Sequence, residues 1–260
     1  MPHLRFRPRV IPVLLMKGNG LVKTTKFADP RYLGDPVNVV RIFNDKGVDE
    51  LMLVDIDASR SGTSSDPELL AEIASEAFVP VASGGGIRSL ADIAARLDLG
   101  FEKAVINSAA VENPRLISEA AAEFGSSTIT VSIDVRNRRF GKREVAIRGG
   151  TKLTGLDPVE HAIAVAGQGA GEIVVQSVDL DGSMSGYDLD LVARIARATD
   201  VPVVALGGAG SIDHLARAIE NGAAAAAAGS MFVYQGRHRA VLINYPSDDQ
   251  LQQCMPRPDQ

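Results

Sequence analysis

The chain repeats part of itself at a constant spacing. Residues 79–89 read VPVASGGGIRS and residues 201–211 read VPVVALGGAGS, so both are β-branched runs that break into glycines. When residues 47–111 are laid over residues 169–233, the offset of 122 positions (169 − 47) never slips. A constant offset of this kind indicates a duplicated structural unit. The coinciding residues are Gly47 and Gly169, Glu50 and Glu172, Asp57 and Asp179, Pro80 and Pro202, Gly85 and Gly207, Gly86 and Gly208, Ser89 and Ser211, Gly100 and Gly222, and Ser108 and Ser230.

Short apolar runs alternate with amphipathic stretches along the chain. The runs have the length and branching of buried parallel strands. The stretches between them, such as DPVNVVRIFNDKG and DPELLAEIASEAF, open with Asp or Asn, as helices prefer. Eight strands that alternate with helices in 260 residues predict an α/β fold, the (β/α)8 TIM barrel. The predicted strands are 10–16, 51–56, 79–83, 104–106, 128–133, 172–177, 201–205 and 224–228.

We predict a single barrel domain over residues 1–260, built from two half-barrels at about 9–125 and 126–235. A doubly wound open sheet is the alternative, but it would not require eight strands with half-chain symmetry. The segment 236–260 is predicted to be atypical. The run FVYQGRHRAVLINYP contains a proline and a β-rich stretch, and both are poor in a final helix.

Composition excludes several classes of protein. The chain is 45% hydrophobic, so it can bury a full core, and it has no uncharged apolar run of about 18 residues that would predict a membrane span. The apolar part of the N-terminal segment is short for a signal peptide. A net charge of −5 argues against non-specific nucleic-acid binding. One cysteine, Cys254, allows neither a disulfide framework nor a thiolate metal cluster. We expect a soluble cytoplasmic protein that binds neither nucleic acid nor membrane.

The repeated glycines follow the third and seventh predicted strands, at the barrel face where chemistry is placed. Glycine there lets backbone N–H groups approach a ligand closely. Ser89 and Ser211 follow as N-caps of helices, whose exposed amides favour anions. Each half is therefore predicted to hold one phosphate group, and the pair predicts an elongated ligand with a phosphate at each end. The predicted phosphate-binding residues are Gly85, Gly86 and Ser108 in one half and Gly207, Gly208, Gly229 and Ser230 in the other.

Acidic residues also stand at the ends of predicted strands. Asp134 closes the fifth strand with an apolar flank, which is unusual for a surface aspartate. Asp181 is interpreted as a polar substrate contact in the barrel mouth or as a structural loop cap. Asp55 and Asp57, at the end of the second strand, have the same two interpretations.

Four charged residues each stand immediately before a strand, so they ring the opposite, N-terminal mouth of the barrel. Two positive and two negative charges can pair into a closed gate, although charges before strands are commonly solvated loop ends. These residues are Arg9, Glu50, Lys103 and Glu172.

No metal or cofactor is expected. The segment DLDGSMSG has the first ligands of a calcium loop, but Met184 occupies the glycine position of such loops. The four histidines are scattered along the chain, which argues against a histidine metal site.

Several longer motifs run through the chain: GDPV, DELMLVDIDAS, GGGI, INSAAVENP, FGSSTITVSIDV, TGLDPVE, GAGEIVVQSVDLDG, SGYD and GGAG. Together they resemble the cyclase subunit of imidazole glycerol phosphate synthase over about residues 9–235. That family is a half-barrel-duplicated (β/α)8 enzyme of histidine biosynthesis. It uses ammonia from a docked glutamine amidotransferase to convert a bisphosphorylated ribulosyl aminoimidazole compound into imidazole glycerol phosphate and a carboxamide ribotide.

The resemblance implies roles for several residues. The family uses two aspartates as acid and base, one at the end of strand one and one at the end of strand five. Asp134 matches the second, but half-barrel symmetry puts Leu15 at the first, and leucine cannot transfer a proton. The following loop keeps Lys23 but has Gly18 where the family has a second aspartate. The resemblance further implies substrate contacts at Lys23, Asp55, Asn107 and Asp181 and an ammonia gate at Arg9, Glu50, Lys103 and Glu172.

The run VIPVLL and the C-terminal segment are similar to a divergent branch of this family, which is linked to amidation of surface-polysaccharide sugars. We therefore expect a barrel that receives ammonia from a glutamine amidotransferase in a heterodimer and binds a phosphorylated small molecule. A sugar amidotransferase is a further candidate partner. Two alternatives remain open: a histidine-pathway cyclase, and a non-catalytic scaffold that binds a phosphorylated ligand and activates the amidotransferase.

Overall fold

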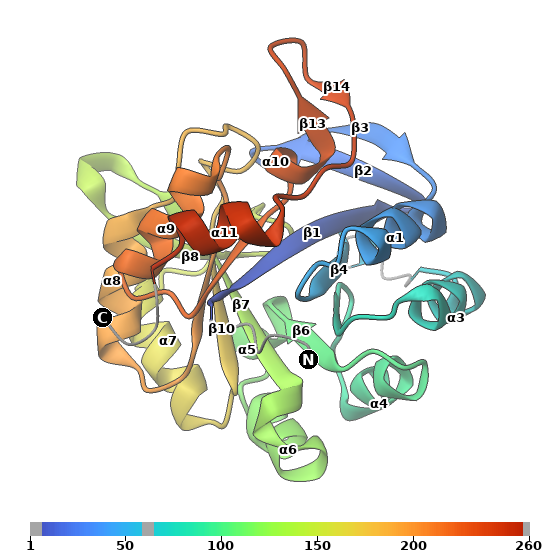
Figure 1. The fold of residues 1–260 in the computed structure, drawn as a ribbon. Coiled ribbons are helices and arrows are strands. Elements are labelled where there is room, and N and C mark those ends of the chain that lie inside the picture. The colour runs from blue at the N-terminus through green and yellow to red at the C-terminus, as the bar shows by residue number, and fades with distance from the viewer. Residues whose placement is uncertain (1–6, 59–64, 257–260) are drawn as a thin grey trace.

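A closed ring of eight parallel strands forms the centre of the computed structural model, which describes residues 7–58 and 65–256 (Figure 1). Each strand pairs with the next, and β7 pairs with β10 to complete the ring. The predicted (β/α)8 barrel is thus confirmed, with strand ends that differ from prediction by a few residues. The barrel strands are β1 (Arg9–Lys17), β4 (Leu51–Asp55), β5 (Val81–Gly84), β6 (Lys103–Ile106), β7 (Ile129–Asn137), β10 (Glu172–Ser177), β11 (Val203–Leu206) and β12 (Ala225–Ala228).

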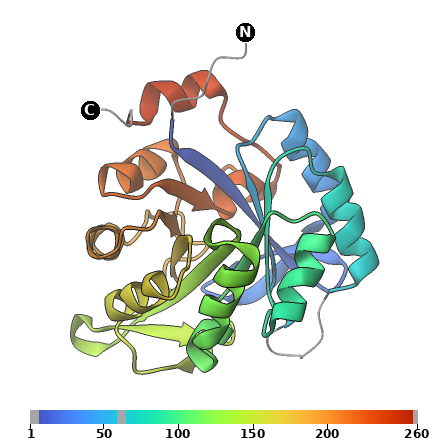
Figure 2. The ribbon, with the colours of Figure 1, turned by 90° about the horizontal axis from the view of Figure 1, so that it is seen from below.

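Helices surround the strands, as the view from below shows (Figure 2). Most begin at an Asp or Ser that accepts a hydrogen bond from an amide of the first turn, which satisfies a donor that the helix leaves free. Ser89 and Ser211 cap α4 and α9 in this way, as predicted. The helices are α1 (Pro36–Asp45), α3 (Pro67–Glu76), α4 (Leu90–Asp98), α5 (Ser108–Glu112), α6 (Arg115–Phe124), α7 (Pro158–Gly167), α8 (Leu189–Ala198) and α9 (Ile212–Glu220), with a 3-10 turn η1 (Ser126–Thr128).

The core has two layers because side chains alternate along each strand. One set packs between strands and helices, for example Ile129, Val131 and Ile133 on β7. The other set points into the barrel, for example Ile11 and Val13 on β1. The barrel interior is therefore a packed column and not an open pore.

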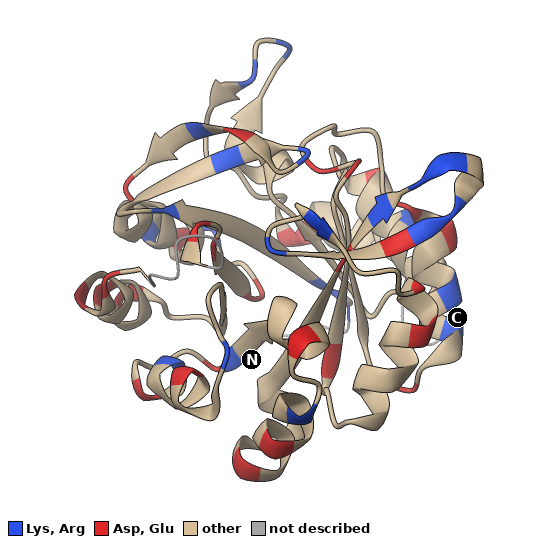
Figure 3. Ribbon diagram, turned by 180° about the vertical axis from the view of Figure 1, so that it is seen from behind, with Lys and Arg blue, Asp and Glu red and all other residues tan. Residues whose placement is uncertain are grey.

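Two hairpins that the sequence did not predict rise at the C-terminal ends of the strands. One extends β1 and consists of β2 (Gly20–Thr25) and β3 (Ala28–Gly34). The other extends β7 and consists of β8 (Arg143–Ile147) and β9 (Lys152–Leu153), and a 3-10 turn η2 (Arg139–Gly141) connects β7 to β8. Basic residues are concentrated around this turn (Figure 3).

The C-terminal segment runs from one face of the barrel to the other. It leaves α10 (Ser230–Val233), forms a small protruding hairpin of β13 (Tyr234–Gln235) and β14 (Ala240–Val241), and ends in the short helix α11 (Asp248–Cys254), which packs against α9 (Figure 1). At the N-terminal end of β1, the Tyr245 hydroxyl donates to the Val10 carbonyl at 3.0 Å. Arg7 pairs there with Asp49 at 2.5 Å and with Asp248 at 2.9 Å.

Among the described residues, no helix is long and apolar enough to cross a membrane.

Candidate functional site

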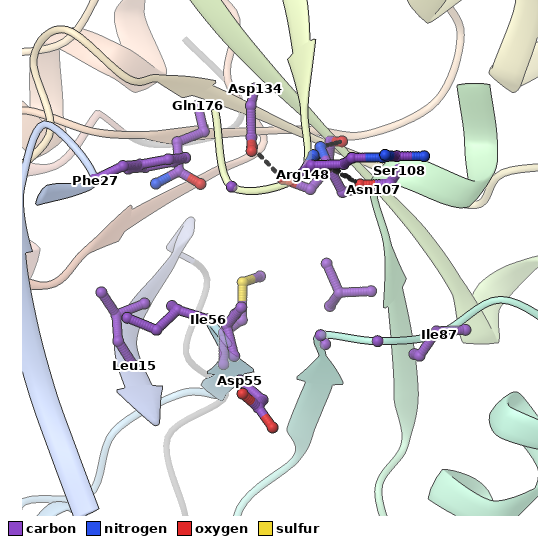
Figure 4. A pocket seen from close by; sticks show the side chains of 18 of the residues that line it. Leu15, Phe27, Asp55, Ile56, Ile87, Asn107, Ser108, Asp134, Arg148 and Gln176 are labelled. Atoms are coloured by element: carbon purple, nitrogen blue, oxygen red, sulfur yellow. Dashed lines mark hydrogen bonds between the residues drawn. The ribbon is translucent and has the colours of Figure 1, made fainter. Parts of the chain in front are cut away.

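A cavity of about 530 Å³ opens at the C-terminal ends of the barrel strands. Its floor is formed by inward side chains of the barrel, and its rim by the loops that follow the strands (Figure 4). Active sites of TIM barrels lie at this face. The lining includes Leu15, Phe27, Asp55, Gly85, Gly86, Asn107, Ser108, Asp134, Arg148 and Gln176.

Asp134 projects from β7 into this cavity (Figure 4). Its side chain is only 6% exposed, and it accepts one hydrogen bond, from the Ser132 hydroxyl at 3.2 Å. Burial raises the pKa of Asp134 to about 7; the Ser132 hydrogen bond lowers it, and the negative charge of Asp181 raises it. An aspartate of this kind can exchange a proton near neutral pH, which is what general acid–base chemistry requires.

Leu15 lies across the cavity from Asp134 (Figure 4). It sits near the end of β1, paired in register with Val54 of β4 and Val22 of β2. Its apolar neighbours inside the barrel include Ile11 and Val13. The side of the mouth formed by β1 therefore offers no proton-transferring group at the position that faces Asp134.

We call the loop after β5, together with Asn107 and Ser108 after β6, the first cradle. Gly85 and Gly86 have positive φ angles of 101° and 76°, and a side chain at Gly85 would collide with the Asp55 carbonyl. Only glycine fits this close approach. The Ser108 hydroxyl accepts from the Arg148 N–H at 2.9 Å and donates to Asn107 Oδ1 at 3.2 Å. This cradle opens directly onto the cavity.

The second cradle is the loop after β11 together with Gly229 and Ser230 after β12. Gly207 and Gly208 have φ angles of 94° and 108°, and the Gly208 carbonyl accepts from the Gly186 N–H at 2.8 Å. The Ser230 hydroxyl is buried and has no hydrogen-bond partner among residues 7–58 and 65–256. None of these four residues lines the cavity. Gly207, Gly208 and Ser230 are buried and Gly229 is half-buried, so the second cradle is built like the first but is more covered by the protein.

Lys23 provides part of this cover. Its ammonium group is buried and pairs with Asp181 at 2.8 Å, and its side chain lies against Gly229. Asp181 also accepts from the Thr24 hydroxyl at 3.0 Å, and its carbonyl accepts from the Lys26 N–H at 3.0 Å. These contacts hold the β2–β3 hairpin against the loop between β10 and α8.

Asp55 lines the cavity, but its carboxylate points toward the backbone of the loop that follows β4. It accepts from the N–H groups of Asp57, Ala58 and Ser65 at 2.9–3.0 Å, and from the Ser65 hydroxyl at 2.5 Å. Of the two interpretations drawn from the sequence, this geometry favours the loop cap. Asp57 lies outside the cavity lining and pairs with Lys17 at 3.7 Å.

Four charged side chains meet at the opposite end of the barrel. Arg9 pairs with both Glu50 and Glu172, and Lys103 pairs with Glu50 at 3.0 Å and with Glu172 at 3.1 Å. Burial by itself would lower the pKa of Arg9, but the two carboxylates raise it above its usual value. We call this closed arrangement of two cations and two anions the four-charge ring.

A line of polar side chains on β7 leads from the four-charge ring to Asp134. Thr130 lies beside Glu172 in the β7–β10 register, and Ser132 follows on the same face of β7. The Thr130 hydroxyl is fully buried and has no hydrogen-bond partner in the part of the chain that the structure describes. The sequence analysis did not single out this line, although the alternation of polar and apolar residues in ITVSIDV carries the signal.

Two further cavity residues were also missed. Arg148 stands at the edge of the first cradle, and Gln176 of β10 lies near Asp134 (Figure 4). Gln176 could have been found from its position at the end of a strand. Arg148 belongs to an unpredicted hairpin, so only the two glycines that follow it marked a turn.

Within residues 7–58 and 65–256, no group of three or more His, Cys, Asp or Glu side chains could hold a metal ion.

Comparison with known proteins gives consistent matches. Residues 9–239 match the family model described as histidine biosynthesis protein. A protein of Leptospira borgpetersenii, provisionally named imidazole glycerol phosphate synthase subunit HisF, is 46% identical over 93% of this chain and 96% of its own length. The provisionally named subunit hisF2 of Pseudomonas aeruginosa is 48% identical over 94% and 98%. Subunit HisF of Alkaliphilus metalliredigens is 42% identical over 87% and 90%.

Proposed function

Because the chain belongs to the histidine biosynthesis protein family, we propose that it is the barrel subunit of a glutamine-dependent complex. In this proposal the barrel receives ammonia from a glutamine amidotransferase at its N-terminal face and delivers it to a phosphorylated acceptor at its C-terminal mouth. The observation that carries the proposal is the position of Asp134: a buried aspartate with a pKa of about 7 at the cavity floor, reached by a polar line from the four-charge ring.

The two cradles support a ligand with two phosphate groups. Gly85 and Gly208 have left-handed backbones in positions that no side chain fits, which is how backbone amides come close to an anion. The unpartnered Ser230 hydroxyl supports the second phosphate position, because a buried hydroxyl without a partner costs free energy that a bound phosphate oxygen would recover. The Lys23 side chain lies against Gly229, so we infer that the β2–β3 hairpin moves when a phosphate group binds there.

The four-charge ring supports entry of ammonia at the N-terminal face. Its members are buried or half-buried, and each cation pairs with both carboxylates. Movement of a single cation would therefore open a passage. Above it, the Thr130 and Ser132 hydroxyls lie inside an otherwise apolar column. A small neutral molecule with N–H donors and a lone pair suits such a path.

The identity of Leu15 bears on which molecule accepts the ammonia. Ring closure by the resembled family uses two aspartates, and of the two matching positions in this chain Asp134 carries a carboxylate whereas Leu15 does not. We therefore propose that the ammonia serves amidation of a surface-polysaccharide sugar, with a sugar amidotransferase as a further partner and the cytoplasm as the site of action. The pathway cyclase is the second candidate, favoured by the full set of cradle residues and by the relatives named as imidazole glycerol phosphate synthase subunits.

The test mixes the chain with a class I glutamine amidotransferase and measures complex formation by gel filtration. We expect a one-to-one complex, and we expect Lys103→Glu to weaken it or to lower the fraction of glutamine nitrogen that reaches the acceptor. Lys103→Glu removes the two contacts that Lys103 makes in the ring and reverses its charge. Lys142→Glu, at the turn between β7 and β8 near the opposite face, is the matched charge-reversal control. Absence of a complex with the native chain would refute the proposal.

A further inference from the structure

An ion pair stands at the edge of the first cradle, and none of the roles proposed above uses it. Arg148 contacts Glu112 through two nitrogens: Nε donates at 3.0 Å and Nη2 lies at 2.7 Å from the same carboxylate oxygen, Oε1. Both residues line the cavity together with Gly86 and Ser108. Arg148 lies alongside Asn107 and Ser108, with the segment around Ile87 across the cavity from them (Figure 4).

The backbone of Arg148 is fixed at both ends. Its N–H donates to the Ser108 hydroxyl at 2.9 Å, and its carbonyl accepts from the Thr151 hydroxyl at 2.7 Å. Its φ angle is 56°, in the left-handed region that residues other than glycine seldom adopt. Strained conformations of this kind persist where the surroundings impose them, and they occur often at ligand sites. The turn between β8 and β9 is thus anchored at Arg148 to a residue of the first cradle.

The guanidinium group, in contrast, is held weakly. The Arg148 side chain is 53% exposed and the Glu112 side chain 39%, so water competes with the ion pair. Exposed pairs of this type change equilibria by about 1.5- to 5-fold. A guanidinium that donates two hydrogen bonds to a phosphate contributes about 10- to 100-fold in affinity. Arg148 would therefore leave Glu112 for a phosphate group that arrives in the cradle.

The Glu112 carboxylate keeps a cation nearby when Arg148 leaves. Lys152 Nζ lies at 4.0 Å from Glu112 Oε1. When Arg148 moves from Glu112 to the phosphate group, the Glu112 carboxylate therefore still has a positive charge beside it.

We propose that Arg148 is a mobile arm that binds the terminal phosphate monoester of the ligand at the first cradle, with Glu112 as its resting partner. The inference rests on the proposed function, because it assumes that the first cradle holds a phosphate group. It adds the residue that selects for a doubly charged phosphate monoester over a neutral or singly charged group, since the guanidinium supplies the fixed positive charge that the glycines and Ser108 lack.

The test measures binding of fructose 1,6-bisphosphate and fructose 6-phosphate by calorimetry. Arg148→Ala should weaken bisphosphate binding about 10-fold or more, and Arg148→Lys should lie between, because lysine keeps the charge but not the paired donors. Glu112→Gln should have the opposite sign and tighten binding up to about 5-fold, because it releases the guanidinium. A structural role for either residue would not produce opposite signs.

Two controls test whether the effect comes from a folding defect or from general charge. Arg148→Gly removes the same side chain but accepts the left-handed backbone, so it should match Arg148→Ala in binding without a folding defect. The matched control is the exposed ion pair of Arg41 and Glu76, at 2.8 Å between α1 and α3 and outside the cavity lining. Arg41→Ala and Glu76→Gln should leave binding unchanged.

The outcomes separate the two proposals. If the native chain binds the bisphosphate no better than the monophosphate, the two-phosphate function fails, and the inference fails with it. If the native chain prefers the bisphosphate but the Arg148 and Glu112 variants bind like the native chain, only the role of Arg148 is overturned. Equal weakening by Arg148→Ala and Arg41→Ala would assign the effect to general charge and would also overturn it.

Discussion

In the first half of the barrel, the glycine loop after β5 opens onto the cavity, whereas in the second half the equivalent loop after β11 is covered. The hydroxyls that follow them differ as well: Ser108 is bonded to Asn107 and to Arg148, while Ser230 is buried without a partner. In the second cradle, the Lys23 side chain lies against Gly229, and the Gly186 N–H donates to the Gly208 carbonyl.

The inward faces of β1 and β7 differ in the same way. On β1 the inward residues Ile11, Val13 and Leu15 are all apolar, whereas β7 presents Thr130, Ser132 and Asp134. A shared scaffold therefore does not imply shared chemistry. The groups that can move protons or guide a polar molecule are concentrated on β7, and the cradle that is open to an arriving ligand belongs to the first half.

The largest test of this asymmetry is to restore the missing carboxylate on β1. With the bisphosphorylated cyclase substrate and saturating ammonium salt, the native chain should form little or no ring product. Leu15→Asp should raise turnover toward the 10²- to 10⁴-fold that one positioned acid–base group typically supplies, with partial recovery because the Gly18 loop is also altered.

Leu15→Asn controls for polarity at this position, because it is similar in size but transfers no proton. Native turnover of about 1 s⁻¹ or more would mean that another group replaces the carboxylate. The contrast between β1 and β7 would then have no catalytic consequence.

A second test uses the buried carboxylate on β7. The pKa of Asp134 is about 7 in the folded chain, against 3.8 for an unperturbed aspartate. The folded state therefore binds more protons between these values, and Asp134 lowers the free energy of unfolding as pH rises from about 4 to 7. The whole loss is on the order of 4 kcal/mol at most, of which roughly 3 kcal/mol falls between pH 5 and pH 8, and Asp134→Asn should remove it. Urea titrations of both chains at pH 5 and pH 8 measure it; parallel pH profiles would contradict the burial of this charge.

A third test, with a smaller expected effect, compares the stability and ligand binding of variants at Ser108 and Ser230. Ser230→Ala should weaken bisphosphate binding by about 1 kcal/mol without lowering the free energy of unfolding, because the hydroxyl has no partner to lose. Ser108→Ala should weaken binding and also lower stability by about 1 kcal/mol, because the Arg148 N–H then loses its acceptor. Calorimetry and urea titration measure the two quantities. Equal stability of the two variants would show that the cradles do not differ in the free protein.

The smallest expected effect concerns the polar line on β7. Thr130→Val keeps the shape of the side chain and removes a buried hydroxyl that has no partner, so the free energy of unfolding should rise by about 0.5–1 kcal/mol. Thermal and urea unfolding measure the change. A decrease of more than about 1 kcal/mol would mean that this hydroxyl has a structural partner in the protein.

Sequence reasoning recovered the features that are encoded locally and missed those that depend on long-range pairing. The eight strands and the helix caps at Ser89 and Ser211 follow from residues close together in the chain. The cover over the second cradle depends on Lys23 and Asp181, which are 158 positions apart. The bonding of Ser108 depends on Arg148, 40 positions away. The hydrogen-bond partners of a polar group are decided only by the folded structure. The residue type at position 108 therefore indicated a cradle, but not that the Ser108 hydroxyl is already hydrogen-bonded.

The contacts of Arg7 have a consequence for how the chain reaches its folded state. Arg7 lies before the first barrel strand, its side chain is 4% exposed, and one of its partners, Asp248, is 241 positions away. β1 also pairs with β12, near the other end of the chain. During synthesis, β1 therefore keeps one unpaired edge until residues 225–228 have left the ribosome. Such high contact order slows folding, so the first strand of the barrel is among the last to be completed.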